Sequence, residues 1–300
     1  FHTVNILVTG NGFIGKALTK KLKELGHNVI TIDKRWGADY KFDISVYDNF
    51  QQLHNTSVDV IYHTAAQSYG HKSMVEPELD VDWNVKGTLN VCRFARHMNV
   101  KKIIYTSTMA VYGEGEWVNE ERELNPLSNY ALSKLYGEYC LKSYSQYGID
   151  YTIFRVFNTY GDGQNLHVER QGVVAAFANQ VVRGKTIKVT GSLDRYRSLI
   201  HIDDNINALL LGLDKDTNGE VYNVCRMNKI TIGNIIKTLI ENSGREEEDF
   251  DIQNIGSPDG DQFGCTGSNE KLRLLGWKPT ISIDEGIKSF YKYAEETING

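Results

Sequence analysis

Short apolar runs alternate with longer amphipathic stretches along the first half of the chain. The apolar runs have few polar residues at alternate positions, which is typical of parallel strands that are buried on both faces. They predict strands at Asn5–Thr9, Asn28–Asp33, Val58–Thr64, Lys102–Ser107 and Tyr151–Phe157. The stretches between them predict helices, of which Asp82–Met98 and Asn129–Tyr147 are the long ones. This alternation predicts an α/β fold, a Rossmann-type doubly wound parallel sheet with right-handed crossovers.

The regular alternation ends after residue 158, and the later apolar runs are shorter. Parts of 223–244 and 268–276 have helical periodicity, and 284–297 predicts a closing amphipathic helix. We expect a smaller, non-contiguous C-terminal lobe that covers the strand ends where ligands bind in such sheets. The expected division gives residues 1–157 plus about 199–227 to the sheet domain, and about 158–198 plus 228–300 to the lobe.

Three glycines follow the first predicted strand. Gly10, Gly12 and Gly15 form a Gly-x-Gly-x-x-Gly motif that leads into a predicted helix over Lys16–Leu25. In this setting the first glycine makes a tight turn, the second lets the backbone approach a pyrophosphate, and the third packs helix on strand. Asp33 ends the second predicted strand, where an acid accepts hydrogen bonds from an adenosine ribose. Together these features predict a dinucleotide site rather than a glycine-rich turn in an unrelated α/β protein.

Tyr130 and Lys134 lie four residues apart in the predicted helix Asn129–Tyr147, so both side chains share one face. A tyrosine phenol titrates near pH ~10. A neighbouring ammonium favours the phenolate and lowers the pKa of the phenol. Such a phenol can take a proton from a sugar or alcohol hydroxyl near neutral pH. The alternative is an exposed helical pair without a catalytic role.

The composition is that of an ordinary globular protein, with 41% hydrophobic and 24% charged residues among 300. A net charge of −5 argues against a general nucleic-acid binder. No apolar run approaches the ~20 residues that span a bilayer, so we expect no membrane segment. We also expect no signal peptide before the first strand. The cysteines lack metal-site spacing, which predicts no metal and buried free thiols in a cytoplasmic protein; they are Cys92, Cys140, Cys225 and Cys265.

Further motifs follow in a fixed order along essentially the whole chain. They are His63–Ser68, Asn84–Thr88, Tyr105–Gly113, Tyr130–Lys134, Arg155–Gly161, Arg197–Asp204 and Leu275–Pro279. In this order and spacing they resemble the extended short-chain dehydrogenase/reductases that act on nucleotide sugars. The chain is most similar to the NAD-dependent sugar-nucleotide epimerases of the UDP-galactose (UDP-glucose) 4-epimerase type.

The resemblance implies a role for each matching residue. Tyr130 matches the catalytic base, Lys134 the lysine that holds the nicotinamide ribose, and Thr108 the hydroxyl that contacts the reacting sugar oxygen. The implied cofactor-binding residues, besides Tyr130 and Lys134, are Gly10, Gly12, Phe13, Ile14, Gly15, Asp33, Asp43, Ile44, Ala65, Ala66 and Asn84. The implied substrate-binding residues are Asn158, Arg197 for the diphosphate, and Cys265 at the position that limits the sugar's C2 substituent.

The resemblance also implies the activity and the partners. The implied reaction is epimerisation of a nucleotide sugar, a UDP-sugar above all, through transient oxidation to a 4-keto sugar. The alternatives are an NAD(P)-dependent reductase or dehydrogenase, a 4,6-dehydratase or decarboxylase, and a non-catalytic NAD-binding regulator. Asp33 favours NAD over NADP, although the cationic Lys34 and Arg35 follow it. A homodimer is implied, built from the helices near 82–98 and 129–147.

The chain departs from the family pattern at three places. Dehydratases carry an acidic pair after the matching threonine, but Met109 and Ala110 occupy these positions, so dehydration would need Glu114 or Glu116. The glycine motif is one residue shorter than usual, yet keeps its three glycines.

The third departure concerns the diphosphate. The family usually has an arginine where this chain has Pro258, so one contact is missing or comes from Arg170 or Lys188. We expect Arg195, beside Arg197, to be a solvated surface charge.

Overall fold

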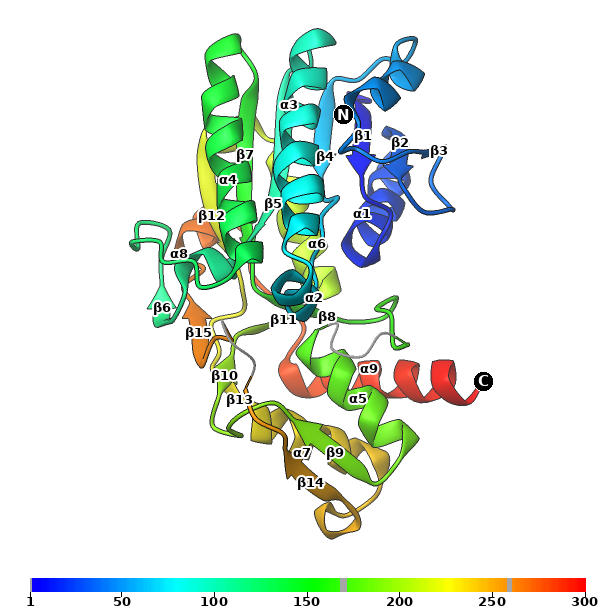
Figure 1. The fold of residues 1–300 in the computed structure, drawn as a ribbon, viewed down its shortest axis with the longest axis vertical. Coiled ribbons are helices and arrows are strands. Elements are labelled where there is room, and N and C mark those ends of the chain that lie inside the picture. Colours follow the sequence, from blue (N-terminus) through cyan, green and yellow to red (C-terminus); the bar gives the residue numbers. More distant parts are fainter. Residues whose placement is uncertain (1, 168–171, 258–260) are drawn as a thin grey trace. The chain divides into compact units, whose positions relative to one another are not determined.

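The computed structural model describes residues 2–167, 172–257 and 261–300, and Figure 1 shows its elements. The chain forms two compact units. The first comprises residues 1–111, 128–155 and 206–222, and the second comprises 112–127, 156–205 and 223–300. The expected division kept 1–157 together. Residues 112–127 instead join the second unit, because their strand β6 (Gly115–Val118) pairs with β15 (Gly264–Gly267).

The first unit is built on a seven-stranded sheet with the order β12-β7-β5-β4-β1-β2-β3. Its strands are β1 (Asn5–Thr9), β2 (Asn28–Asp33), β3 (Tyr40–Lys41), β4 (Val60–His63), β5 (Lys102–Thr108), β7 (Asp150–Val156) and β12 (Glu220–Val224). The pairs from β3 across to β5 are parallel. The chain fills one side of β1 first and then the other, so the topological switch point lies between β1 and β4. This is the doubly wound order, and it confirms the predicted fold class.

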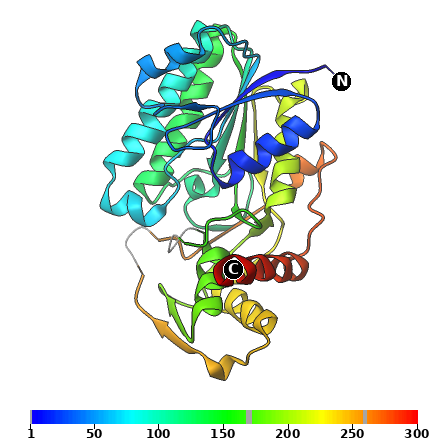
Figure 2. The same cartoon turned by 90° about the vertical axis from the view of Figure 1, so that its right-hand side faces the viewer.

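Helices cover both faces of this sheet. Figure 2 shows α1 on one side and α3 and α4 on the other. The helices of this part of the chain are α1 (Phe13–Glu24), α2 (Gly70–Val75), a π-helical turn (Asp80–Lys86), α3 (Gly87–His97) and α4 (Asn129–Tyr144). The 3-10 helices are Tyr47–Leu53, Met109–Tyr112, Ser145–Tyr147, Leu211–Leu213 and Lys215–Thr217. The predicted long helices are therefore present, but the first begins with a π-helical turn.

Helix α4 starts where its sequence provides a cap. The Ser128 hydroxyl accepts a hydrogen bond from the Ala131 N–H at 3.1 Å, which satisfies one of the free donors of the first turn. Further along, Gly137 lets the helix lie close to the sheet, since a Cβ there would be 2.3 Å from the Tyr105 hydroxyl. The cap and this glycine fix where α4 begins and how closely it packs.

The second unit contains small sheets and three longer helices around a separate apolar core. Its sheets have the orders β13-β10-β15-β6, β11-β8 and β14-β9. The strands besides β6 and β15 are β8 (Asn158–Tyr160), β9 (Thr186–Val189), β10 (Tyr196–Arg197), β11 (Leu199–His201), β13 (Ile230–Thr231) and β14 (Asp251–Asn254). The helices are α5 (Val173–Arg183), α7 (Ile232–Ser243), α8 (Glu270–Arg273) and α9 (Ile283–Asn299), with a 3-10 helix at Glu247–Asp249. Helix α6 (Ile202–Leu210) crosses from the second unit into the first.

The stretches 223–244 and 268–276 are helical in part, as the sequence pattern predicts, with α7 in the first and α8 in the second. The stretch 223–244 begins with the end of β12 and with β13, and its helix starts only at Ile232. Thr231 is the reason for this start, because its side chain caps the helix by accepting the Asn234 N–H. The predicted closing helix is present as α9, which begins with a capping box of Ser282 and Glu285.

A buried carboxylate holds the segment before α9. Asp204, which is 1% exposed, accepts hydrogen bonds from the Thr280 N–H at 2.9 Å, the Thr280 hydroxyl at 3.0 Å and the Ile281 N–H at 3.0 Å. Its backbone carbonyl also accepts the Trp277 indole N–H at 3.1 Å. Trp277 therefore has a structural role in this unit, as does Asp204.

Replacement of Asp204 by alanine should destabilise the protein. The substitution leaves buried donors without acceptors, each at a cost of about 1–3 kcal/mol. We expect the free energy of unfolding, measured by chemical denaturation, to fall by roughly 3 kcal/mol or more. The neighbouring Asp203, whose side chain is 72% exposed, is the control: Asp203→Ala should change it by less than about 0.5 kcal/mol. Equal effects of the two substitutions would contradict this account.

Candidate active site

The glycine turn after β1 depends on two close backbone approaches. Gly10 has φ +90°, and a Cβ on it would lie 2.8 Å from the backbone of Ala65. A Cβ on Gly15 would lie 1.9 Å from the Gly10 carbonyl oxygen. Gly10 thus permits both the left-handed turn and the contact with the segment after β4, and Gly15 lets α1 pack on the turn.

Gly12 differs from the other two because open space adjoins it. A Cβ there would find its nearest heavy atom, a guanidinium nitrogen of Arg35, at 3.6 Å. Gly12 is also the N-cap of α1 and provides no side-chain hydrogen bond to the first turn, to which Phe13 and Ile14 belong. A helix N-terminus with free N–H groups and an approachable backbone fits a pyrophosphate.

Two carboxylates follow at the ends of neighbouring strands. The Asp33 carboxylate, at the end of β2, accepts the Asn11 N–H at 2.7 Å and the Arg35 N–H at 2.8 Å. The Asp43 carboxylate accepts the Ser45 N–H at 2.8 Å. These bonds fix both acids while leaving them further acceptor capacity, as recognition of a ribose or an adenine requires.

Two residues that directly follow these carboxylates in the chain, Lys34 and Ile44, are also held in place by their neighbours. Ile44 is buried and packs against Gly87, where a Cβ would lie 2.7 Å from its Cδ1. The Lys34 ammonium lies over the Trp83 ring, 2.7 Å from its centroid. Burial lowers the pKa of Lys34, and the charge of Asp43 opposes this effect. Lys34 is therefore held against an aromatic face.

Asn84 connects the segment after β4 with α4. Its side chain accepts the Gln67 N–H at 2.8 Å and donates to the Gln67 carbonyl at 3.0 Å and to the Ser133 hydroxyl at 2.9 Å. Ser133 in turn donates to the Tyr130 carbonyl at 2.7 Å. Ala65 and Ala66 lie in the same segment, directly after β4. The buried Asn84 thereby links their strand to the turn of α4 that carries Tyr130.

The structure brings Thr108, Tyr130 and Lys134 together in the first unit. Thr108 is the last residue of β5, and Tyr130 and Lys134 lie one turn apart on α4. The Thr108 side chain is close enough to the Tyr130 phenol to lower its pKa. The Lys134 ammonium is buried and lies over the Tyr105 ring, 4.4 Å from its centroid. A hydroxyl, a phenol and an ammonium are thus fixed around one end of the sheet.

The expected direction of the pKa shift of Tyr130 is wrong for this structure. Burial raises the pKa of Tyr130 to about 12, the Thr108 side chain lowers it, and the charge of Asp80 raises it. Burial lowers the pKa of Lys134 to about 7, against the opposing charge of Glu138. The ammonium over Tyr105 is desolvated, and its charge is not among the causes that shift the pKa of Tyr130.

Sequence reasoning missed a buried ion pair beneath this group. Arg155 on β7 binds the Glu138 carboxylate with two hydrogen bonds, of 2.7 and 3.1 Å, and the Ser107 hydroxyl donates to it at 2.7 Å. Arg155 and Glu138 are 3% and 1% exposed. Glu138 lies one turn after Lys134, and Ser107 directly precedes Thr108. The sequence contained one signal for this: the four-residue spacing of Lys134 and Glu138 puts the glutamate on the same helix face as the lysine.

The predicted substrate residues lie in the second unit, and two of them are neighbours. Arg197 on β10 is opposite Cys265 on β15 in the parallel register. Both are buried. Asn158 begins β8, and its side-chain oxygen is buried without a hydrogen-bond partner among the described residues. An acceptor in this position suits a hydroxyl-rich ligand.

The expectation for Arg195 is wrong, because it is 6% exposed and not solvated. Its guanidinium forms an ion pair with Asp261. Of the other residues expected near the diphosphate, Pro258 and Arg170 lie outside the described residues. Lys188 is exposed on β9.

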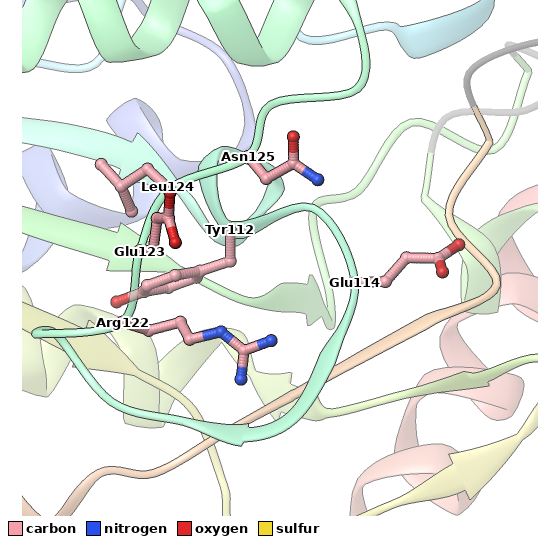
Figure 3. Close-up of a pocket in the computed structure, with 6 residues that line it drawn as sticks. All are labelled: Tyr112, Glu114, Arg122, Glu123, Leu124 and Asn125. Carbon is pink, nitrogen blue, oxygen red and sulfur yellow. The ribbon is translucent and has the colours of Figure 1, made fainter.

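A pocket of about 280 Å³ also lies in the second unit, and it contains none of the predicted site residues. Its lining residues, drawn in Figure 3, are Tyr112, Glu114, Arg122, Glu123, Leu124 and Asn125. Glu114 points away from Tyr112 in this view, and its carboxylate accepts the Phe263 N–H at 2.8 Å. Glu116 pairs with Lys229 at 2.5 Å. Both acids that a dehydratase reading would need are therefore engaged within the second unit.

Comparison with known proteins identifies the family. The family model described as the NAD dependent epimerase/dehydratase family matches residues 6–225. The chain belongs to this family. It is 30% identical to a UDP-glucose 4-epimerase of Mycolicibacterium smegmatis, over 94% of this chain and 95% of that protein.

Solved structures of the epimerase/dehydratase family agree with this assignment. A UDP-glucose 4-epimerase of Thermotoga maritima, solved with UDP-glucose, has a TM-score of 0.91 and 29% identity, covering 98% of this chain and 99% of that one. A UDP-glucose 4-epimerase of Thermus thermophilus in complex with NAD has a TM-score of 0.88 and 28% identity, covering 97% and 98%. The resemblance drawn from the ordered motifs is confirmed. Among the described residues, no helix is long and apolar enough to cross a membrane.

The buried lysine should leave a signature in the pH dependence of stability. The pKa of Lys134 is about 7 in the folded protein, below its ordinary value of 10.5. Between these values the unfolded chain holds the extra proton, so this lysine makes the folded state more stable as the pH rises. Lys134→Met keeps the apolar stem without the titration. The free energy of unfolding of the wild type should therefore rise relative to that of the variant over this range.

The exposed Lys142 on the same helix provides the control for this measurement. Lys142→Met should give a difference from the wild type that stays constant between pH 7 and 10.5. A constant difference for Lys134→Met as well would show that Lys134 is not desolvated.

Proposed function

We propose that the protein is an NAD-dependent epimerase that inverts C4 of a UDP-sugar through transient oxidation. The observation that carries the proposal is that one unit holds Thr108 at the end of β5, Tyr130 and Lys134 one turn apart on α4, and the glycine turn. This group supplies a proton acceptor, a neutral hydroxyl and a cation at one place. A sugar hydroxyl that becomes a ketone and then a hydroxyl again needs all three.

Tyr130 acts as the general base. It accepts the proton of the C4 hydroxyl as the sugar is oxidised, and returns it when the epimeric hydroxyl forms. Thr108 follows the sugar oxygen through both states, because a hydroxyl can donate to a ketone and accept from an alcohol. Lys134 holds the ribose next to the nicotinamide. Tyr130 thus gains one proton and gives it back within each turnover, so the protein ends the cycle unchanged.

NAD fits the first unit, as the open backbone at Gly12 and the uncapped first turn of α1 indicate. The residues that would hold it are those of the glycine turn with Asp33, Asp43 and Ile44, together with Ala65, Ala66 and Asn84. When bound, NAD accepts the hydride and gives it back, and its positive nicotinamide ring favours the phenolate of Tyr130. Asp33 would repel a 2′-phosphate, which favours NAD over NADP.

The substrate is bound by residues of the second unit. Arg197 binds the diphosphate, since a guanidinium offers a charge-assisted bidentate fork to phosphate oxygens. Asn158 offers its free side-chain oxygen to a hydroxyl. Cys265 lies beside the sugar C2 substituent and is small enough to admit an N-acetyl group. The NAD-binding domain is then the first unit, residues 1–111, 128–155 and 206–222, and the substrate lobe is the second unit.

The alternatives use the same motifs but differ in outcome. A reductase or dehydrogenase would consume the cofactor. A dehydratase or decarboxylase would need a proton-transferring side chain after Thr108, where Met109 and Ala110 lie. A non-catalytic regulator would have no need of the intact group around Tyr130.

Tyr130→Phe should abolish the interconversion of UDP-glucose and UDP-galactose while NAD remains bound. The substitution removes the proton acceptor and keeps the ring, and general-base catalysis contributes ~10²-fold or more. Product formation measured by NMR, with the absorbance at 340 nm followed in parallel, tests both points. The wild type should convert the sugar without a net change at 340 nm. A net change would favour a reductase, and more than about a tenth of wild-type activity in the variant would exclude Tyr130 as the base.

We also propose that the protein is a cytoplasmic homodimer. Leu132, Tyr136 and Tyr139 form an apolar stripe at helical spacing along α4, with exposed fractions of 53%, 36% and 59%. A second copy would cover this stripe and form a bundle with α3 and α4 of the first.

The four buried free cysteines fit a reducing compartment, which supports the cytoplasmic location.

Tyr139→Glu should shift the mass in solution from dimer to monomer. A charge placed on the stripe would have to be buried in the interface without a partner. Light scattering at micromolar concentration measures the mass. Trp36→Glu, which places the same charge on an aromatic residue 84% exposed elsewhere, should keep the dimer. A wild-type protein with the mass of a monomer would rule out the pairing.

A further inference from the structure

Two buried arginines of the second unit share a single carboxylate. Arg195 forms an ion pair with one oxygen of Asp261, and a guanidinium nitrogen of Arg197 lies 3.7 Å from the other oxygen. Arg195 is 6% and Arg197 8% exposed. The three side chains together carry one positive charge in excess.

The positions of the two arginines follow from the strand. Arg197 belongs to β10, and Arg195 lies two residues before it. Side chains two residues apart in an extended segment project to the same face. Asp261 comes from the chain just before β15, which pairs with β10 in parallel; both strands are labelled in Figure 1. The two guanidinia are therefore presented side by side.

The remaining partners of these arginines are neutral. Arg197 donates to the carbonyls of Tyr196 at 2.8 Å, Phe263 at 3.1 Å and Gln262 at 3.2 Å. Arg195 donates to the Ser192 carbonyl at 3.3 Å. These carbonyl oxygens accept hydrogen bonds from the two guanidinium groups and fix their orientation, but they carry no negative charge to compensate the positive charges.

Among the residues that the structure describes, the two arginines form ion pairs with no acid other than Asp261. Burial lowers the pKa of Arg197, the charge of Asp261 raises it, and the charge of Arg195 lowers it again. The Glu116 carboxylate is paired with Lys229. An uncompensated buried charge is costly, and an anionic ligand that binds there relieves the cost.

We propose that Arg195 is a second diphosphate-binding arginine, which acts with Arg197 on the substrate nucleotide while Asp261 holds the two guanidinia in place. The inference rests on the proposed function for the identity of the anion. Arg195 supplies the positive charge that Pro258 cannot. The excess positive charge attracts the negatively charged diphosphate of a nucleotide sugar, both guanidinia offer it N–H donors, and the Asp261 carboxylate holds the two arginines together in the free protein.

The test compares the binding of UDP, UMP and uridine to the NAD-loaded enzyme by calorimetry. In Arg195→Gln the affinity for UDP should fall about ten- to hundredfold, as expected for a lost charge-assisted bond to phosphate. The affinity for uridine should stay within about twofold, and the loss for UMP should be smaller than for UDP. Arg195→Lys, which keeps the charge without the fork, should lose less UDP affinity than Arg195→Gln. If Arg195→Gln does not fold, the UDP affinity of Arg195→Lys is compared with that of the wild type instead.

Arg183→Gln removes an exposed arginine of the same unit and is the matched control; it should bind all three ligands as the wild type does. Equal losses for UDP and uridine in Arg195→Gln would assign Arg195 a purely structural role and overturn the inference. Unchanged UDP affinity would overturn it as well, without touching the proposed function. A wild type that binds UDP through Arg195 but converts no sugar would overturn the proposed function and leave the inference standing.

Discussion

The ion pair of Glu138 and Arg155 is the interaction on which the arrangement of Thr108, Tyr130 and Lys134, the proposed catalytic group, depends. It joins α4 to β7, and the Ser107 hydroxyl joins the same carboxylate to β5. Tyr130 and Lys134 are carried by that helix, and Thr108 is the next residue of that strand. A helix that slid or rotated on the sheet would break a fully buried, bidentate ion pair, at a cost of about 3–5 kcal/mol. The pair therefore sets the mutual positions of all three side chains.

Buried charges in this protein differ in how completely they are compensated. Glu138 and Arg155 neutralise each other, and the Ser107 hydroxyl donates a further hydrogen bond to the Glu138 carboxylate. Lys134 is also buried, but its ammonium has only the Tyr105 ring and the more distant charge of Glu138, so its pKa falls to about 7. In the second unit Arg195 and Arg197 are left with one acid between them. The incompletely compensated charges, those of Lys134 and of the two arginines, are the ones to which the proposals above assign a ligand.

Close backbone contact is the other constraint on the first unit. Gly10 and Gly15 each occupy a place where a Cβ would collide with backbone atoms. Gly12 has no such contact, so packing does not require its missing side chain. Two glycines of the motif are therefore explained by packing, and the third by the pyrophosphate that the proposed function places there.

Much of the first unit could be predicted because its signals are local. A buried parallel strand requires a continuous apolar run, so β1 and β2 were predicted with the bounds that they have. The turn between them requires glycines, and the pairing of Tyr130 with Lys134 follows from helical spacing. The order of the motifs along the chain was enough to indicate the family.

Tertiary structure decided what depends on contacts between distant segments. The place of residues 112–127 follows from the pairing of β6 with β15, which periodicity along the chain does not indicate. The pKa of Tyr130 rises because folding buries it, an effect that spacing on a helix cannot reveal. From the sequence alone Arg195 was expected to be a surface charge. In the folded protein it is buried and paired with Asp261, which lies 66 residues further along the chain. The sequence by itself determined the elements, the cofactor turn and the family, because these rest on neighbours along the chain. Solvation and charge compensation were decided by the fold, because they depend on what surrounds a side chain in space.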